Sequence, residues 1–362
     1  MNTLQHKKNF HSLCLKARQG IILLVAALWV VACKDAPGQT QKPSSRGLPY
    51  ELVLIVPQAI YTGELKDTLD AVLQGSTPVL PQHEPLFRLD VAYADGNLTP
   101  WRTFRNRLVI ALDKKALQPE MGAALDAVAR PQIEVKVSAA TPHDLALFIG
   151  ENRQRLTDLF VDHELDLEAA RLRRKYSKAT ADSLRKLTAS VVPSTTSAAV
   201  PSQSCEGHTI CVPEGLRASK TGTDFLWTGT NLNDKDQNFV YYSYVWDGRP
   251  LTPEQFVVKR DSALKANIPG AQPNQWMQTA CGPDGATPLI LARTRTIDEA
   301  LVQEVHGLWE MHNGALGGAF VALERIDTAA RRVLVTEGFI YSPHSPKRNL
   351  MRQMEAALRT WK

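Results

Sequence analysis

Residues 50–56 read YELVLIV, a run of apolar side chains with the length and composition of one buried β-strand. Residues 63–74 then place their apolar side chains on one helical stripe. Further strands are expected at 86–93, 104–112 and 132–138, with a short helix at 119–130. The resulting order β-α-β-β-α-β is that of a ferredoxin-like domain, an antiparallel sheet with helices on one face. We therefore predict such a domain over residues 48–190.

A long helix is predicted to end this domain. Thr141, Pro142 and Asp144 supply its N-cap hydroxyl, a proline at the first helical position and an acid in the first turn. Residues 191–206 are rich in Ser, Thr and Pro and low in charge, as is typical of a linker. Beyond them, at 207–362, apolar runs predict an antiparallel sheet covered by two helices. The chain is thus expected to be an α+β protein.

Residues 1–32 have the composition of an export signal. They contain four basic residues and no acidic one, and they end in an apolar run at 21–32. As a helix this run would span about 18 Å, well short of the roughly 30 Å hydrocarbon core of a membrane, so we expect a cleaved leader. Its removal lowers the formal net charge from +5 to +1. A nearly neutral chain argues against a nucleic-acid partner.

The residues Val30-Val31-Ala32-Cys33 resemble the signal box of bacterial lipoproteins. The resemblance implies that the chain is cut before Cys33 and that Cys33 carries the acyl chains that anchor the protein in a membrane. Residues 33–47 would then form a flexible tether. In bacterial lipoproteins, an Asp directly after the lipidated cysteine favours retention in the inner membrane. Lys34 occupies this position here, so we expect the outer membrane. The sequence favours neither the periplasmic nor the surface orientation. A soluble secreted protein or an uncleaved anchor is the alternative.

Seven short strings resemble an uncharacterised family of Bacteroidota lipoproteins, a domain of unknown function. In chain order they are LPQHEPLF at 80–87, RN at 105–106, NIPG at 267–270, GLWEM at 307–311, GGAF at 317–320, EGFIYSP at 337–343 and KRN at 347–349. The chain departs from the family pattern at Ala319, where proline is expected, and at Cys205 and Cys211, which are not expected. The resemblance implies an envelope-anchored protein and provides no catalytic residue.

Four titratable residues alternate along one predicted strand and so share a face of its sheet: Glu304, His306, Glu310 and His312. Such a set could bind a metal or exchange protons. An envelope hydrolase with its site around His306, His312 and Glu310, or at Glu337 and Lys347, is therefore our alternative function. A polar outer face of the strand, opposite an apolar one, explains the same pattern. No nucleophile motif accompanies these residues, and we predict no metal and no cofactor.

A basic cluster stands at the start of the last predicted helix, where Lys347 and Arg348 fall in the first turn. Positive charge there opposes the helix dipole. An anion bound at the free backbone N–H groups, with Lys347, Arg348 and Arg352 as counter-charges, would explain the placement. Pairing of these residues with Glu337 or Glu355 is the other explanation. Phosphate, sulfate or an acidic glycan is the ligand expected at such a site.

Cys205 and Cys211 flank a short loop that contains a glycine, and a disulfide could close it. With His208 they could instead hold a metal, although their spacing fits no zinc motif.

Two patterns concern glycans. Asp-Ser/Thr-aliphatic triplets resemble the O-glycosylation sequence of exported Bacteroidota proteins, with acceptors Thr68, Ser183, Ser262 and Thr328. Of the seven tryptophans, the six beyond residue 32 could stack on sugars, although we expect most of them to fill the core.

Together these observations favour a non-catalytic lipoprotein of the cell envelope over a hydrolase. We expect it to be held at the outer membrane through Cys33 and to bind an envelope protein, a glycan or an anionic ligand through its α+β domains. We expect no nucleic-acid partner.

Overall fold

The computed structural model describes residues 42–178 and 210–361, apart from 214, 217, 223 and 298. Residues Ser44–Lys362 form one compact unit. The predictions for Cys33, Ser183, Cys205, His208 and the linker concern residues outside the described ones. Within the described ranges, no helix is both long and apolar enough to cross a membrane.

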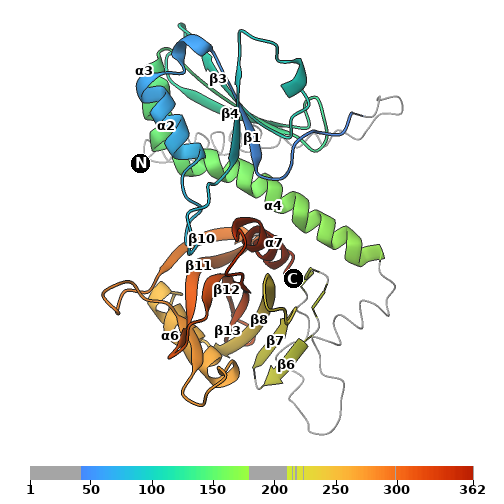
Figure 1. Ribbon diagram of the computed structural model, residues 1–362, viewed down its shortest axis with the longest axis vertical. Coiled ribbons are helices and arrows are strands. Elements are labelled where there is room, and N and C mark those ends of the chain that lie inside the picture. The colour runs from blue at the N-terminus through green and yellow to red at the C-terminus, as the bar shows by residue number, and fades with distance from the viewer. Residues whose placement is uncertain are drawn as a thin grey trace, which may run out of the picture. The chain divides into compact units, whose positions relative to one another are not determined.

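Five strands form the first sheet: β1 (Glu51–Val56), β2 (Arg88–Tyr93), β3 (Asn106–Leu112), β4 (Glu120–Leu125) and β5 (Ile133–Ala139). Their order is β2-β1-β3-β5-β4 (Figure 1). β1 is parallel to β2 and β3, and β3 is parallel to β5, whereas the edge strand β4 is antiparallel to β5. The prediction of an antiparallel, ferredoxin-like sheet is therefore wrong. β1 gives the physical reason, because it is buried on both faces, as inner strands of parallel sheets are.

The segment expected to form a short helix, 119–130, contains strand β4 and the turn that leads back toward β5. Buried Gln132 holds this turn. Its side-chain oxygen accepts hydrogen bonds from the N–H groups of Val128 and Ala129, at 3.0 and 3.3 Å. Its side-chain nitrogen donates to the carbonyl of Phe104 at 2.8 Å. These hydrogen bonds, two local and one tertiary, outweigh the helix propensity of the alanines in the segment.

Three α-helices belong to the first half of the chain: α2 (Gly63–Leu73), α3 (Pro142–Glu151) and α4 (Arg153–Lys178). Two single turns of 3-10 helix, η2 (Gln58–Ile60) and η3 (Thr99–Trp101), lie in its connections. The predicted cap is confirmed, because the Thr141 hydroxyl accepts from the N–H of Asp144 at 3.1 Å. The predicted long helix is divided at Asn152, whose side chain donates to the carbonyl of Phe148 at 2.9 Å where α3 ends.

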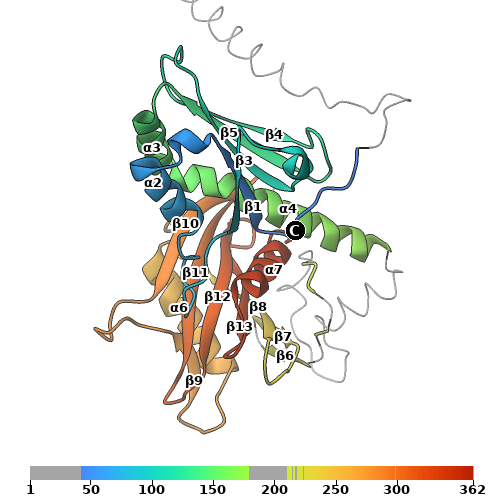
Figure 2. The ribbon, with the colours of Figure 1, turned by 45° about the horizontal axis from the view of Figure 1, so that its top comes forward.

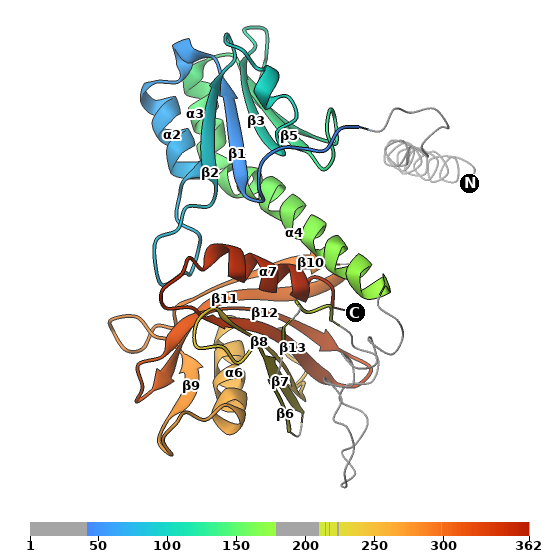
Figure 3. The ribbon, with the colours of Figure 1, turned by 45° about the vertical axis from the view of Figure 1, so that its right-hand side comes forward.

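Eight strands form the second sheet: β6 (Ala218–Gly222), β7 (Phe225–Gly229), β8 (Asp236–Val245), β9 (Trp276–Thr279), β10 (Ile290–Ile297), β11 (Ala300–His312), β12 (Gly317–Asp327) and β13 (Arg332–Tyr341). Their order is β10-β11-β12-β13-β8-β7-β6, with β9 beside β11, and every pair is antiparallel. Helices α6 (Pro253–Asn267) and α7 (Arg348–Leu358) lie on opposite faces of it (Figure 3). The predicted antiparallel sheet with two covering helices is confirmed, and so is the α+β class.

Close packing explains three of the family-like strings. A Cβ atom on Gly318 would lie 2.1 Å from the carbonyl oxygen of Ile340, and one on Gly307 would lie 2.2 Å from the ring of Phe320. The indole N–H of Trp309 donates to the same Ile340 carbonyl at 3.1 Å. GLWEM, GGAF and EGFIYSP therefore encode a close approach of β11, β12 and β13 that larger side chains would prevent.

Helix α4 joins the two sheets (Figure 2). It contributes Leu156 and Phe160 to the core of the first sheet, and farther along it contributes Leu172 to the core under α7. Between these positions, Asp162 forms ion pairs with Arg359 at 2.6 Å and Arg295 at 2.5 Å. The helix therefore fixes the place where α7 and β10 meet the first sheet.

Candidate functional site

A cavity of about 280 Å³ lies at this junction. Its lining comes from α4, from strands β10 to β12, from α7 and from the loop at residues 77–86, which we call the strap. The strap leaves the first sheet after α2 and reaches the start of α7 (Figure 3). Apolar side chains form most of the wall, and four residues with basic side chains join them: Arg293, His306, Arg348 and Arg352.

The strap is fastened to the start of α7 by hydrogen bonds. The Glu84 carboxylate accepts from the backbone N–H groups of Lys347 and Arg348, at 2.6 and 2.9 Å. The Lys347 ammonium donates to the side-chain oxygen of Gln82 at 3.0 Å, and the Arg348 guanidinium donates to the carbonyl of Pro85 at 2.6 Å. Two of the family-like strings, LPQHEPLF and KRN, thus meet although 263 residues separate Glu84 from Lys347.

The predicted anion position at the helix start therefore holds a carboxylate of the chain itself. α7 begins at Arg348 with Lys347 as its N-cap, so Glu84 stands at the positive end of the helix dipole. Arg352 pairs with Glu355 at 2.7 Å, as the alternative explanation proposed. Binding of an external anion by the Lys347, Arg348 and Arg352 side chains stays a prediction.

Arg348 is a half-buried cation at the cavity wall that has no carboxylate within ion-pair distance in the described part of the chain. Besides Pro85, its guanidinium donates to the carbonyl of Leu86 at 3.4 Å and to the side-chain oxygen of Asn349 at 3.1 Å. Burial lowers the pKa of Arg348, and the nearby Glu84 carboxylate offsets this effect only in part. The cavity wall thus carries a positive charge that lacks an ion-pair partner.

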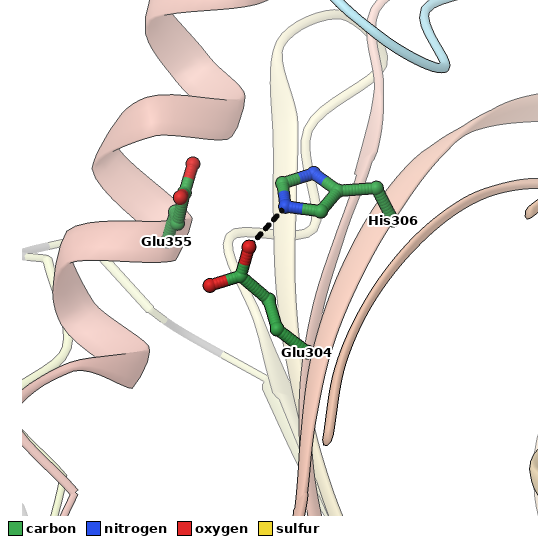
Figure 4. Close-up of side chains that lie close together, drawn as sticks. All are labelled: Glu304, His306 and Glu355. Carbon is green, nitrogen blue, oxygen red and sulfur yellow. Dashed lines mark hydrogen bonds and ion pairs between the residues drawn. The ribbon is translucent and has the colours of Figure 1, made fainter. Parts of the chain in front are cut away.

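A charged cluster around Glu304 lies between β11 and α7, and His306 and Glu355 of this cluster also line the cavity (Figure 4). Glu304 is fully buried, and its carboxylate lies 2.6 Å from Arg293, 3.0 Å from Nε2 of His306 and 3.8 Å from Arg295. Burial raises the pKa of Glu304, but the hydrogen bond and charge of His306 and the two arginines outweigh burial and hold that pKa far below its usual range. Glu304 is therefore a fixed negative charge.

The same cluster contains a donor set that a metal could use. The ligand atoms of Glu304, His306 and Glu355 all lie within 4.8 Å of one another. The carboxylates, however, already face four guanidinium groups: two at Glu304, and those of Arg352 and Arg359 at 2.7 and 3.8 Å from Glu355. A divalent cation would add positive charge to a buried site that is already rich in it. These residues therefore fit an ion-pair network better than a resident metal.

The residues of the predicted hydrolase site are not brought together. Glu310 and His312 share a face of β11 with Glu304 but lie at its far end, beside β9. There Glu310 accepts from Gln278 at 2.9 Å, and the His312 ring stacks on Trp276 with 4.0 Å between ring centroids. The expectation of a polar outer face is also corrected, because the cavity and α7 lie over the Glu304 end of the strand.

Two further acids are buried on the other face of the second sheet, under α6. Glu337 pairs with Arg260 of α6 at 2.7 Å, and both side chains are fully buried. Because α7 lies on the opposite face, Glu337 and Lys347 do not form a joint site. Glu324 accepts a hydrogen bond from the hydroxyl of Tyr244.

The predicted O-glycosylation acceptors and the tryptophans differ in exposure. Thr68 is half-buried on α2, whereas Ser262 on α6 and Thr328 in the turn after β12 are exposed. O-glycosylation at these residues stays a prediction. All six tryptophans beyond residue 32 are buried or half-buried, and Trp276 lies between the His312 ring and the Lys265 ammonium.

Comparisons with known protein families divide the chain into two ranges, one for each of the two sheets. Residues 45–173 match a domain of unknown function, DUF8532, and residues 200–360 match another, DUF4837. Each match covers less than half of the chain, and neither matching domain has a known function. The prediction of an uncharacterised family is confirmed, whereas membership of the Bacteroidota lipoproteins stays a prediction. No curated protein matches the chain. Among solved structures, a mutant of the protein Mog1 is similar with a TM-score of 0.27 and 11% identity, over 43% of this chain and 89% of that chain.

The cavity takes its lining from both matched ranges. The DUF8532 range supplies the strap and the first half of α4, and the DUF4837 range supplies β10 to β12 and α7. Sequence reasoning missed Glu84 and Arg293 as site residues. The string LPQHEPLF pointed to the first, and cross-strand pairing of Arg293 with Glu304 could have pointed to the second.

Proposed function

We propose that this protein is an envelope lipoprotein, anchored at the outer membrane through Cys33, and that it binds an anionic ligand in the cavity beside the strap without changing it chemically. The basic and then apolar leader, followed by the box that ends at Cys33, supports the anchor. The observation that carries the binding function is the half-buried Arg348 guanidinium without an ion-pair partner among the described residues. Arginine is the side chain best suited to carboxylate and phosphate groups.

An anion could bind at Arg348 without displacing a carboxylate of the protein from its ion pair. Two carboxylates line the cavity, and each is already engaged: Asp158 lies 3.3 Å from Arg293, and Glu355 lies 2.7 Å from Arg352. Arg348 can therefore receive a ligand without breaking either ion pair. Such an arrangement gains the charge-assisted hydrogen bonds of the ligand at little cost to the protein.

The charged cluster around Glu304 favours binding over turnover. General acid–base catalysis works best with a group whose pKa lies near the working pH. Glu304 is held far below that range, and the same carboxylate occupies a ring nitrogen of His306. Glu304 therefore holds a negative charge in place beside the cavity.

Thermal unfolding tests the anion site. The mature chain, residues 33–362, with Cys33→Ser to prevent lipidation, is unfolded in sodium phosphate and in sodium chloride of the same ionic strength. We expect phosphate to raise the unfolding midpoint of this protein and of an Arg331→Gln control, whose side chain is exposed in the turn between β12 and β13. We expect Arg348→Gln to lose most of that rise. Equal rises in all three proteins would contradict anion binding at Arg348.

Cell fractionation tests the anchor separately. The wild-type chain should be recovered with outer membranes and should carry acyl chains in its intact mass, whereas Cys33→Ala should lose the acyl chains. Wild-type protein without added acyl mass would contradict the anchor and leave the cavity proposal unaffected.

A further inference from the structure

We infer that the anionic ligand is a single-chain amphiphile, whose head group binds at Arg348 and Arg352 and whose apolar chain lies along the strap; this inference rests on the proposed anion binding. The apolar part of the cavity wall carries it. The strap contributes Val79, Leu80 and Leu86 to the lining, and the second sheet and α7 contribute Leu291 and Met351 among others. An inorganic anion would leave this apolar wall uncovered.

Leu291 shows that the apolar wall is open rather than sealed. Met351 is 6% exposed, but Leu291, on strand β10, is 46% exposed although it lines the same cavity. Large apolar side chains that face open space in a concave site are stabilised when an apolar ligand covers them. A ligand chain that covers Leu291 therefore gains burial that an ion alone cannot give.

The size of the cavity favours one short chain. Its volume of about 280 Å³ equals that of roughly nine molecules of liquid water. A head group with one chain of about eight carbons fills such a space, whereas a second chain would lie mostly outside it, without apolar contact. The chemistry that the cavity recognises is therefore a carboxylate or phosphate head on a single alkyl chain.

The strap has the features of a fixed ligand clamp. Val79 has a φ of +52°, in the left-handed region that β-branched residues avoid, so the backbone is strained at the cavity wall. Strain of this kind persists only where surrounding contacts impose it, and it is concentrated at ligand clamps and active sites. The contacts are those of Glu84 and Gln82 with the start of α7, together with the N–H of Thr77, which donates to the Glu84 carbonyl at 2.7 Å.

The head-group position follows from the charges. Arg348 and Arg352 lie one turn apart on α7, and both line the cavity. Nε of Arg352 is buried and makes no hydrogen bond within the described part of the chain. A head group at Arg348 would thus also approach Arg352, while the ligand chain extends toward the apolar residues of the strap.

Calorimetric titration separates the head from the chain. The probes are octanoate, acetate with the same head, 1-octanol with a similar chain, octyl phosphate and inorganic phosphate, each added to the mature Cys33→Ser chain. We expect octanoate to bind at least about tenfold more tightly than acetate and than 1-octanol, because the two parts of the site act together. Octyl phosphate should likewise bind more tightly than inorganic phosphate.

Two variants locate the parts of the site. Arg348→Gln should weaken octanoate at least about tenfold and leave 1-octanol unchanged, since it removes a charge-assisted hydrogen bond. Leu291→Asn, a neutral change at a position exposed enough to accept a polar side chain, should weaken octanoate and leave inorganic phosphate unchanged. Thr328→Asn, at an exposed turn, is the matched control and should bind as the parent does.

The outcomes distinguish the inferred amphiphile ligand from the proposed anion binding on which it rests. If phosphate binds at Arg348 but octanoate binds no more tightly than acetate, the amphiphile is refuted and the anion site stands. If neither octanoate nor phosphate binds, both fail. If octanoate binds equally well to the parent and to Leu291→Asn, the chain lies elsewhere and the inference is overturned.

Discussion

Glu324 gives a prediction whose magnitude can be worked out. It is 1% exposed on β12, and its carboxylate accepts from the hydroxyl of Tyr244 and, at 2.9 Å, from the side-chain nitrogen of Gln303. No cation lies within ion-pair distance of it in the described part of the chain. Burial therefore raises the pKa of Glu324 from an ordinary 4.5 to about 7, and the hydrogen bond from Tyr244 lowers it only in part.

The sign of the effect on stability follows from proton binding. Between pH 4.5 and about 7 the folded state keeps the proton that the unfolded state has already released. The folded state thus binds more protons there, so its stability falls as pH rises through this window. The difference between the two pKa values corresponds to about 3 kcal/mol of unfolding free energy, fully present below the lower value and lost above the higher one.

Glu324→Gln removes the titrating group and keeps its shape and its hydrogen-bond acceptor. Relative to wild type, we expect this variant to be more stable by up to about 3 kcal/mol at pH 8 and to differ by less than about 1 kcal/mol at pH 5. Urea unfolding at each pH, followed by circular dichroism, measures both values. Glu120→Gln, at an exposed carboxylate on β4, is the control and should not become more stable than wild type on going from pH 5 to pH 8. An equal effect of Glu324→Gln at pH 5 and pH 8 would refute the reasoning.

Three more predictions, one of them with a matched control substitution, concern the packing and the charges. Glu84→Gln should lower stability by about 1 kcal/mol, because a neutral amide caps the start of α7 less well than a carboxylate; no loss in urea unfolding would contradict the cap. Gly318→Ala should cost more than about 2 kcal/mol, because its Cβ meets a backbone carbonyl, whereas Gly122→Ala, with open space, should change stability by less than about 0.5 kcal/mol. Glu337→Gln should cost about 3 kcal/mol in the same assay, because it leaves Arg260 without its buried partner; a neutral result would show that the pair contributes nothing.

Local sequence patterns predicted most of the helices and strands, because the start and the periodicity of such an element depend on residues that are neighbours in the sequence. Thr141 and Asp144 identified the start of α3, and alternating apolar side chains identified the long strands of the second sheet. The direction of pairing in the first sheet was missed, although YELVLIV lacks the alternation of a half-exposed strand and so indicates burial on both faces. The turn held by Gln132 could not be predicted, because the side-chain nitrogen of Gln132 is fixed by the carbonyl of Phe104, 28 residues earlier in the chain.

The candidate site was predictable only in part for the same reason. The sequence identified Lys347 and Arg348 as an unusual start to a helix. The carboxylate that binds their N–H groups belongs to Glu84, and no residue near Glu84 or near Lys347 predicts this long-range contact. Strand alternation placed Glu304 and His306 on one face. It did not show that α7 covers that face, because helix packing depends on the whole fold. The strings of the family resemblance gave the best long-range signal, since two of them meet at the strap.

Titration of octanoate into the mature chain and into its Arg348→Gln variant, at pH 7 and with the same ionic strength, tests the central claim most directly. If Arg348 is the cation that receives the ligand in the cavity, the parent should bind octanoate at one saturable site, and the variant should bind it at least about tenfold more weakly. Equal affinity in the two proteins, or no binding to the parent, would contradict an amphiphile site at Arg348.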